Sequence, residues 1–496
     1  MLSYWINSKS IKEQIFIPKY YDPEIREDVN RLSKTHFIFS IGELESKQYI
    51  SVSTGDEIGK LSYGTGSIPF VRTSDISNWE IKSIPKQGIS EEIYNEYCKS
   101  QDVKEGDILL VRDGTYLIGT NCFITYLDKK ILYQSHILKF RIIDIDSINP
   151  YLFFLALNSS FVQRQIRNIQ FTADIIDTIG NRYKEIFIPI PKDISTQETM
   201  IEKTKEALES RVMGKAFIKQ CPFLIEETLK NNNSLSISSF SKQSIKEIAG
   251  TLKQDTVTAE FGEFEYFWHN ASDIKDNIFI PKYYEPSITK ELSSLEKNCF
   301  LLSMKKLKED KIIDYAIGDE IGKMSYGTGE IPFIRTSDFS NWEIKHDPKQ
   351  GISEDIYNIY KDKQDVKEND ILLVKDGTYL IGNSCIITKS NSKSLFCAGL
   401  YKIRVFKNEK NLLDPFLLLG LLNSYIVKRQ IRTKQFTRDV IDTIGARIEE
   451  VIIPIPKSKE LRKHISDSIK NVVNSRINGR NTVSNLSKSL INNHSQ

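Results

Sequence analysis

The sequence predicts an α+β protein with two similar domains, each a small β-rich sheet plus helices. Long antiparallel spacer helices separate these domains, and a pseudo-twofold axis relates them. Three observations predict this fold class. The chain has 496 residues, and chains longer than about 250–300 residues divide into domains because a single core stops growing. One long segment occurs twice, and a helical pattern with one apolar stripe follows each copy.

The repeat organises the whole chain. Residues 55–82 recur at 318–345, an offset of 263 residues, and only four positions differ between the two segments. Two residues are inserted further along the second copy, so that 150–167 align with 415–432 at an offset of 265. Duplicated domains explain so long a period, because solenoid repeats span about 20–50 residues. We therefore expect one domain at 1–195, a spacer helix and linker at 196–260, a second domain at 261–457, and a C-terminal spacer helix with a mobile tail at 458–496.

Each copy contains the same order of predicted elements. Short β-favouring runs separated by Gly, Asn, Asp and Pro predict the sheet. A helix should begin at Pro150 or Pro415 and end in the sequence RQIR, since proline suits the first helical turn. The closing segments EIFIPIP and EVIIPIP predict a last strand at a sheet edge, because proline cannot donate to a strand ladder.

The segments after the two copies have apolar residues at helical spacing. One stripe contains Ile201, Thr204, Leu208 and Val212, and the other is formed by Leu461, Ile465, Ile469, Val472 and Arg476. Such a stripe needs a packing partner. Each helix packs either on its own domain or, antiparallel, on the other helix. The stretch that begins at residue 231 is linker-like.

Composition narrows the class of protein. Apolar residues make up 40% and charged residues 27% of the chain, as in globular proteins, and the net charge of +3 requires any DNA-binding face to be local. The first residues lack a secretory signal and no apolar stretch is long enough for a bilayer span, so we expect a cytoplasmic protein. The six cysteines are scattered without metal-ligand spacing and are expected to be reduced thiols.

Catalytic motifs are missing from the sequence. The segment IGKLS at 58 has Leu61 where a P-loop needs Ser or Thr, and the YGTG segments lack the rest of a dinucleotide fingerprint. No Asn-Pro-Pro-aromatic or Asp-Pro-Pro-aromatic segment of an amino-methyltransferase occurs. Carboxylates near Asp107 and Asp370 fit a metal-dependent nuclease poorly, and His136 has Gly399 as its counterpart. A duplicated enzyme should duplicate its catalytic base, so we expect a protein without catalysis and without a metal or cofactor of its own.

The repeated segments instead carry side chains that contact DNA, on turns rich in glycine. Arg and Lys bind guanine or phosphate, Asn and Gln bind adenine, and glycine allows the backbone to approach closely. The candidates lie in a Gly-rich turn, in RTSD followed by Asn-Trp, and in a DGTY turn. They are Lys60, Tyr63, Thr65, Arg72, Thr73, Ser74, Asn78, Trp79, Arg112, Thr115 and Tyr116 in the first copy, and Lys323, Tyr326, Thr328, Arg335, Thr336, Ser337, Asn341, Trp342, Lys375, Thr378 and Tyr379 in the second.

These residues also have structural explanations. Asp75 and Asp338 can close an Asx turn, Trp79 and Trp342 can be core aromatics, and Gly114 and Gly377 can serve a hairpin. The run from Val427 to Arg438 contains more cations than its counterpart, which suits phosphate contacts by Lys428, Arg429 and Arg432 or a solvated face. If the repeated turns read bases, the two half-sites should be similar and approach an inverted repeat. If they are scaffold, specificity lies where the copies diverge, at 120–141 against 383–404, including Gln134 against Cys397.

The order of these motifs resembles the specificity subunits of type I restriction-modification enzymes over nearly the whole chain. In that family, two target-recognition domains each end in an I-P-x-P strand and a long helix, as at Ile188–Pro191 and Ile453–Pro456. The family's G-x-I-P-x-x-R turn, G-D-I-L strand and Y-L helix resemble Gly66–Arg72, Gly106–Leu109 and Tyr151–Leu152. The chain departs from the family in its degenerate Gln-containing stretch after the I-P-x-P motif and in its nearly identical central segments.

The resemblance implies a non-catalytic subunit that reads a bipartite target on double-stranded DNA. It would direct adenine-specific methyltransferase subunits to that target, together with a translocating nuclease subunit. S-adenosylmethionine, ATP and Mg²⁺ would then act on the partner subunits only. Two alternatives from other classes are a stand-alone DNA endonuclease and a non-catalytic protein-binding or regulatory module.

Overall fold

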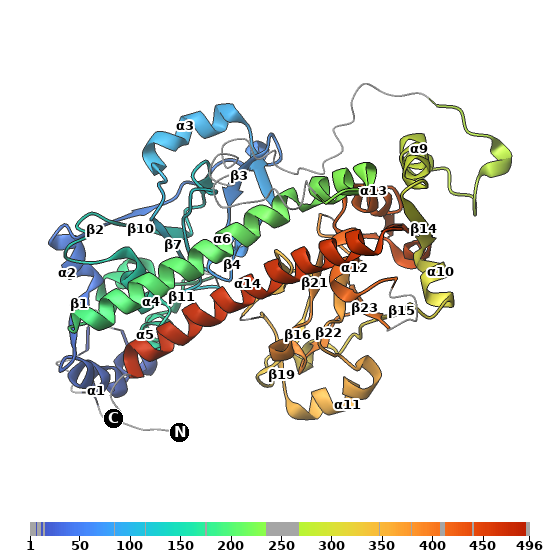
Figure 1. Cartoon of the computed structure of the whole chain (residues 1–496). Coiled ribbons are helices and arrows are strands. Elements are labelled where there is room, and N and C mark those ends of the chain that lie inside the picture. The colour runs from blue at the N-terminus through green and yellow to red at the C-terminus, as the bar shows by residue number, and fades with distance from the viewer. Residues whose placement is uncertain are drawn as a thin grey trace. The chain divides into compact units, whose positions relative to one another are not determined.

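The computed structural model describes residues 6, 11–12, 15–83, 85–114, 116–173, 176–234, 267–346, 348–377, 379–406, 412–438 and 441–492. The chain divides into two compact units. Unit 1 consists of Met1–Val212 and Arg476–Gln496, and unit 2 consists of Met213–Ser475. The boundary between the units falls inside the two longest helices, α6 (Ile194–Asn231) and α14 (Lys459–Asn492) (Figure 1). The expected linker after residue 234 lies outside the described residues.

Unit 1 is built from small antiparallel sheets. The four-stranded sheet has the order β2-β10-β7-β8 and is antiparallel throughout. A three-stranded sheet has the order β6-β3-β9, in which β3 pairs antiparallel with β6 and parallel with β9. The strands are β1 (His36–Ser40), β2 (Ile50–Thr54), β3 (Ile68–Val71), β4 (Ile76–Ser77), β5 (Glu80–Ile81), β6 (Gln87–Ile89), β7 (Ile108–Val111), β8 (Asn121–Phe123), β9 (Leu132–Tyr133), β10 (Ile137–Ile142), β11 (Phe171–Ala173), β12 (Ile176–Thr178) and β13 (Phe187–Pro191).

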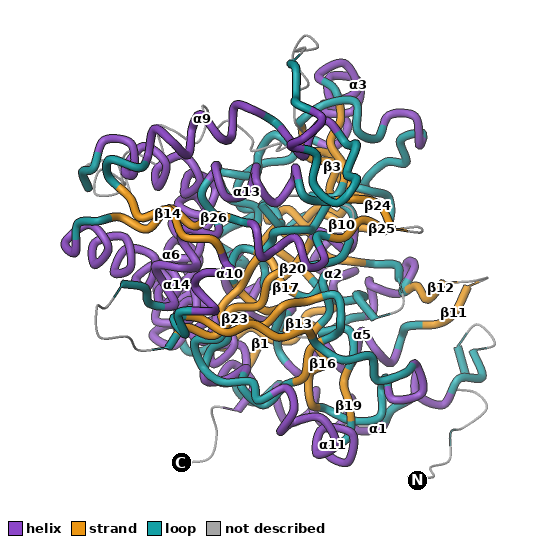
Figure 2. Tube along the Cα trace, turned by 90° about the vertical axis from the view of Figure 1, so that its right-hand side faces the viewer, coloured by secondary structure: helices purple, strands orange, loops and turns teal. Residues whose placement is uncertain are grey.

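The closing strand β13 lies at the edge of a sheet, which is the position that its prolines require. It pairs only with β1, antiparallel, in a two-stranded sheet. This confirms the edge strand predicted from the IPIP sequence. Figure 2 shows β11 beside β12, the two strands of another antiparallel pair of unit 1.

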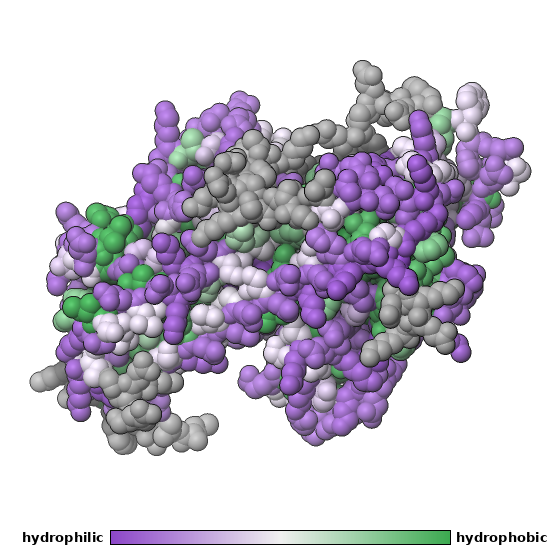
Figure 3. All heavy atoms as spheres, in the orientation of Figure 1, coloured by the Kyte–Doolittle hydropathy of each residue, from purple (hydrophilic) through white to green (hydrophobic). Residues whose placement is uncertain are grey.

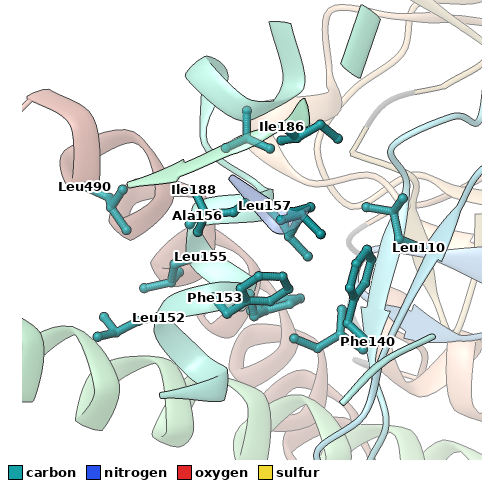
Figure 4. Close-up of a cluster of buried hydrophobic side chains, with 14 of the residues drawn as sticks. Leu110, Phe140, Leu152, Phe153, Leu155, Ala156, Leu157, Ile186, Ile188 and Leu490 are labelled. Atoms are coloured by element: carbon teal, nitrogen blue, oxygen red, sulfur yellow. The ribbon is translucent and has the colours of Figure 1, made fainter. Parts of the chain in front are cut away.

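The main core of unit 1 surrounds helix α4 (Pro150–Leu157). All residues from Leu152 to Leu157 are buried in it, together with Phe140 of β10 and Ile188 of β13 (Figure 4). Leu490 of α14 packs in the same cluster. Unit 1 also contains α1 (Pro23–Leu32), α2 (Ile41–Ser46), α3 (Glu91–Gln101) and α5 (Ser160–Asn168).

Unit 2 repeats this architecture element by element. Its four-stranded sheet has the order β15-β23-β20-β21, and its three-stranded sheet has the order β19-β16-β22. The strands are β14 (Cys299–Ser303), β15 (Ile313–Ile317), β16 (Ile331–Ile334), β17 (Phe339–Ser340), β18 (Glu343–Ile344), β19 (Gly351–Ile352), β20 (Ile371–Val374), β21 (Ser384–Ile386), β22 (Leu395–Phe396), β23 (Leu400–Val405), β24 (Phe436–Arg438), β25 (Ile441–Thr443) and β26 (Ile452–Pro456). The helices are α9 (Pro286–Leu295), α10 (Met304–Glu309), α11 (Glu354–Gln364), α12 (Pro415–Leu422) and α13 (Tyr425–Thr433).

The helix predicted from Pro150 to the RQIR sequence is two helices in each unit, so the prediction of one helix was wrong. In unit 1, α4 ends before Asn158 and α5 begins after Ser159. The Ser159 hydroxyl accepts a hydrogen bond from the backbone N–H of Val162, as an N-cap does. Ser159 therefore caps a second helix. The boundary between the two helices was not predicted because the sequence around it is mostly apolar.

The long spacer helices of the predicted fold class are confirmed. Helices α6 and α14 continue to Asn231 and Asn492, so the chain after Arg480 is helical as far as Asn492. Val483, Leu490 and Ile491 are buried. The burial of these three residues in the core of unit 1 stabilises the last turns of α14, although few residues of that segment are apolar.

Within unit 1, the two long helices pack on each other in antiparallel directions. The guanidinium of Arg211 on α6 donates to the carbonyl oxygen of Arg476 on α14, and that of Arg476 donates to the carbonyl oxygen of Arg211, both at 3.0 Å. Glu80 accepts from Arg476 at 2.5 Å, so this buried charge is paired. The helices also pack on their own units, so both alternatives left open by the sequence apply.

Candidate nucleic-acid interface

The Gly-rich turn is held by its own polar side chains. The Thr65 hydroxyl donates to the carbonyl oxygen of Ser62 at 2.8 Å and accepts from the backbone N–H of Ser90 at 3.0 Å. Thr328 makes the same two bonds in unit 2. Tyr63 and Tyr326 pack on Phe70 and Phe333, with ring centroids 5.6 Å apart in each pair. The threonine and the tyrosine of each turn therefore stabilise the turn itself. Lys60 and Lys323 are exposed and remain candidates for phosphate contacts.

The RTSD turn is closed by its buried aspartate. Asp75 accepts from the backbone N–H groups of Arg72 at 3.0 Å and Lys86 at 3.1 Å, and Asp338 accepts from Arg335 at 2.9 Å. Burial raises the pKa of both carboxyl groups. These aspartates hold the turn, but not as the Asx turns that the sequence suggested, because the N–H groups that they bind lie three residues earlier and, for Asp75, also eleven residues later. Arg72, Thr73 and Ser74 remain partly exposed, as do Arg335, Thr336 and Ser337 in unit 2.

The Asn-Trp pair that follows forms a hairpin turn. Asn78 and Trp79 have φ of 52° and 66°, and Asn341 and Trp342 have φ of 51° and 65°. Two successive positive φ values are the signature of the two-residue turn that joins β4 to β5. The Trp79 indole N–H donates to Asn158 Oδ1 at 2.8 Å, and Trp342 is only 3% exposed. The structure favours the core-aromatic alternative for both tryptophans, and Asn78 and Asn341 are buried with them.

The DGTY turn carries a charged pair in each unit. Arg112 donates through Nε and Nη2 to the carboxylate of Asp113, with the shortest bond at 2.8 Å, and Lys375 lies 2.9 Å from Asp376. Gly114 and Gly377 have φ of 127° and 130°, a backbone conformation that glycine tolerates. Tyr116 is 39% exposed and Tyr379 is half-buried. Thr115 and Thr378 lie outside the described residues.

The basic run of unit 2 is largely engaged in internal contacts. Arg429 on α13 forms ion pairs with Glu285 at 2.6 Å and Glu291 at 2.7 Å, which attach α13 to α9. Arg432 donates to the carbonyl oxygen of Tyr379 at 3.0 Å, and burial lowers its pKa. Lys428 is half-buried. These contacts explain the extra cations of this run as fold-stabilising residues rather than as a row of phosphate ligands.

Two of the predicted clusters meet at one short loop, which we call the central loop: Gln134–His136 in unit 1 and Cys397–Gly399 in unit 2. On one side, the backbone N–H of Gln134 donates to Val71, next to Arg72, at 3.0 Å. On the other side, the backbone N–H of Arg112 donates to the carbonyl oxygen of His136 at 2.9 Å. Each central loop thus lies between the RTSD turn and the DGTY turn.

The same backbone contacts hold the central loop of unit 2. Cys397 donates through its backbone N–H to Ile334 at 3.0 Å, and Lys375 donates to the carbonyl oxygen of Gly399 at 2.9 Å. The backbone hydrogen bonds that hold the central loop are therefore the same in both units, although the side chains of the loop differ.

His136 is a site residue that the sequence candidates omitted. Its Nδ1 lies 2.9 Å from Asp113 Oδ2, and its side chain is 35% exposed. Burial acts to raise the pKa of Asp113, but hydrogen bonds from Arg112, Thr178 and His136 outweigh burial and lower that pKa. The signal that was available is the position of His136 in the divergent stretch, two residues after Gln134.

Neither a membrane span nor a metal cluster is found in the described part of the chain. None of its helices is long and apolar enough to cross a membrane. No group of three or more His, Cys, Asp or Glu residues is placed to hold a metal ion in the same part. On the face drawn in Figure 3, hydrophilic side chains predominate and hydrophobic ones form small separate areas.

Each α+β unit has a long helix and cationic side chains beside a loop that differs between the copies, an arrangement suited to a protein that binds at two places. The model of the type I restriction modification DNA specificity domain matches residues 35–206 and 304–484. The chain belongs to this family, and it is a DNA-specificity subunit without catalysis of its own. This confirms the family, the fold class of two recognition domains and the non-catalytic role that the sequence predicted.

Several solved structures are similar to the chain. The S subunit of a type I restriction-modification system from M. genitalium has 12% identity, covering 92% of this chain and 95% of that chain, with a TM-score of 0.32. The HsdS subunit from Thermoanaerobacter tengcongensis has 14% identity over 92% of this chain and 96% of that one, with a TM-score of 0.27. A structure described for complex assembly and conformational transition of the type I R-M system has 14% identity, coverages of 92% and 97%, and a TM-score of 0.27. No curated protein matches the chain.

Proposed function

We propose that each unit reads one half of a bipartite double-stranded DNA target through its central loop and the two turns beside it. Arg72 and Arg112 in unit 1, and Arg335 and Lys375 in unit 2, supply positive charge at this place. Arginine and lysine are the side chains that most often bind guanine in the major groove and phosphate along the backbone. The other candidates of the Gly-rich turns, Lys60 and Lys323, would contact phosphate.

One observation carries this proposal. The cationic turns, separated by about 40 residues in sequence, lie on either side of one loop in both units, held by the same backbone hydrogen bonds. The residue changes from Arg112 to Lys375 but the positive charge persists, and each cation is held beside the loop by the aspartate that follows it. Phosphate contacts position a protein on DNA, whereas contacts to base edges specify the sequence.

The structure supports the second of the two sequence hypotheses on half-site similarity. Asp75, Thr65 and Trp79, with their counterparts, hold turns or fill the core, so much of the nearly identical sequence is scaffold. Specificity would then come from the side chains that differ, including Gln134 against Cys397. We therefore expect two half-sites that are not the inverse of each other.

The proposal extends to partners. The chain would direct adenine-specific DNA methyltransferase subunits, and a translocating nuclease subunit, to the target in the cytoplasm. S-adenosylmethionine, ATP and Mg²⁺ would act on those subunits only. Support comes from family membership.

We expect an adenine methyltransferase gene beside the gene for this chain. The test is to express the two together and to map methylated adenines by long-read sequencing. We expect one motif with two short specified halves and a fixed spacer. The chain purified alone should leave DNA intact in the presence of Mg²⁺. Absence of any methylated motif, or cleavage by the chain alone, would contradict the proposal.

A further inference from the structure

The two central loops differ in chemistry although their backbone frames are the same. In unit 1 the loop presents Gln134, Ser135 and His136, whose side chains all have groups that can donate or accept hydrogen bonds. In unit 2 it presents Cys397, Ala398 and Gly399. Burial raises the pKa of the Cys397 thiol, which keeps it neutral. Polar reading groups are therefore present on one loop and nearly absent from the other.

A complete polar network fixes His136 in unit 1. Asp113 is only 6% exposed in its side chain and accepts from Arg112, from Thr178 and from His136 Nδ1. Because an ionised carboxylate only accepts, Nδ1 carries the proton of that bond. The ring atom left for an external partner is Nε2, whose neighbouring charge is Glu57 at 3.9 Å.

Unit 2 has no equivalent of this arrangement. A Cβ atom added at Gly399 would lie 2.9 Å from Thr336 Cγ2, so the position is filled by a neighbour rather than left for a side chain. Asp376 Oδ1, the counterpart of a fully bonded oxygen of Asp113, is buried and has no hydrogen-bond partner among the described residues. The histidine and the bonds around it are specific to unit 1.

A positioned and partly exposed imidazole suits the recognition of one base edge. Side chains that specify sequence must be held in orientation by a second set of contacts, because a freely rotating group selects weakly. His136 satisfies this condition through Asp113, and it lies between the cationic turns that flank the central loop. In the major groove, each base pair offers a distinct set of donors and acceptors to such a ring nitrogen.

We infer that His136 is a specificity-determining residue, which hydrogen-bonds a base edge through Nε2 and thereby fixes one position of the half-site read by unit 1. This inference rests on the proposed function, because it assumes that the central loops face DNA. It also predicts that the half-site read by unit 2 has no contact of this kind. The two halves of the target should consequently be specified by different means.

The test compares methylation motifs in cells that express wild-type or variant chains with the same methyltransferase. His136→Ala should relax one position of one half-site, with discrimination there falling by about tenfold or more, while the other half stays unchanged. His136→Gln, which keeps a hydrogen-bonding end, should change the preferred base at that position instead. Asn95→Ala is the control, because Asn95 is exposed on α3, outside the central loop and the two turns beside it, and its motif should be unchanged.

The outcomes separate the two proposals. If the wild-type chain gives no methylated motif, the proposed function fails. If the wild-type chain gives a motif and both His136 variants give the same motif at every position, only the inference on His136 fails. Thermal melting and recovery of the methyltransferase complex show whether a variant has folded. A variant that is folded and assembled but relaxes positions in both halves also overturns the inference, because His136 belongs to unit 1 alone.

Discussion

Individual residues of the candidate interface divide into those that build turns and those that remain available. Trp79 donates its indole N–H to Asn158, which itself bonds Asn121, so the ring completes a polar contact inside unit 1. A tryptophan with positive φ costs backbone free energy, on the order of 1–3 kcal/mol, and persists only where the surroundings determine it. Its duplication as Trp342 therefore indicates a structural role in both units.

At the residue scale, Glu226 makes stability depend on pH. Burial and a hydrogen bond to Glu291 raise the pKa of Glu226 from its ordinary value of 4.5 to about 7. The folded state thus holds a proton that the unfolded state has lost. Stability from this group is fully present below about pH 4.5 and is lost as pH rises through about 7.

We predict that Glu226→Gln removes this loss, because the amide cannot ionise. In a thermal melting series from pH 5 to pH 8, the melting temperature of the wild type should fall relative to that of the variant. The difference at pH 8 should correspond to about 1–3 kcal/mol. Glu227→Gln, an exposed neighbour on the same helix, is the control and should follow the wild type. Parallel pH profiles for wild type and Glu226→Gln would refute the prediction.

At the element scale, the contact of α6 with α14 in unit 1 depends on a glycine. A Cβ atom added at Gly479 would lie 2.8 Å from the carbonyl oxygen of Ala207 and 2.9 Å from Arg211 Cγ. The first of these atoms belongs to the backbone and cannot rotate away. Close approach of the helices therefore requires the absence of a side chain at this position.

We predict that Gly479→Ala destabilises the protein, although Gly→Ala inside a helix ordinarily stabilises it by about 0.5–1 kcal/mol. Overpacking at this contact should cost about 1–3 kcal/mol, measured as the change in the urea unfolding midpoint. Asn481→Ala, at an exposed position two residues further along α14, should instead be neutral or slightly stabilising. A gain in stability for Gly479→Ala would show that the helices do not approach this closely.

At the scale of the whole molecule, the duplication predicts that both units contribute to one DNA-binding event. Arg72 and Arg335 occupy equivalent turns in different units. Effects of substitutions at separate sites add in free energy. Each single change should therefore weaken binding, and the double change should multiply the two effects.

We predict that Arg72→Ala and Arg335→Ala each raise the Kd for target DNA about tenfold, and the double variant about a hundredfold. Fluorescence anisotropy over a salt series measures both affinity and its salt dependence, which should weaken with each lost phosphate contact. Lys99→Ala, an exposed cation on α3, is the control for general charge loss. Wild-type affinity of the double variant at physiological salt would contradict the assignment of the RTSD turns to the interface.

The sequence alone determined the duplication, the α+β class, the closing edge strands and the family. These follow from residue identity and local pattern, which are legible without coordinates. It did not determine that Ser159 divides a helix, that α14 continues to Asn492, or that Arg429 binds Glu285 and Glu291. Those features depend on which surfaces become buried against each other.

The central loop also has features that the sequence determines and features that only the tertiary structure decides. Comparison of the two copies in the sequence locates the divergent stretch, because divergence is visible in the residue identities alone. Only the tertiary structure brought Arg72, His136 and Arg112 to one place, since hydrogen bonds between distant backbone segments decide that proximity. Whether a polar residue holds a turn or faces a ligand is fixed by burial and by its partners, and neither is encoded in its local sequence.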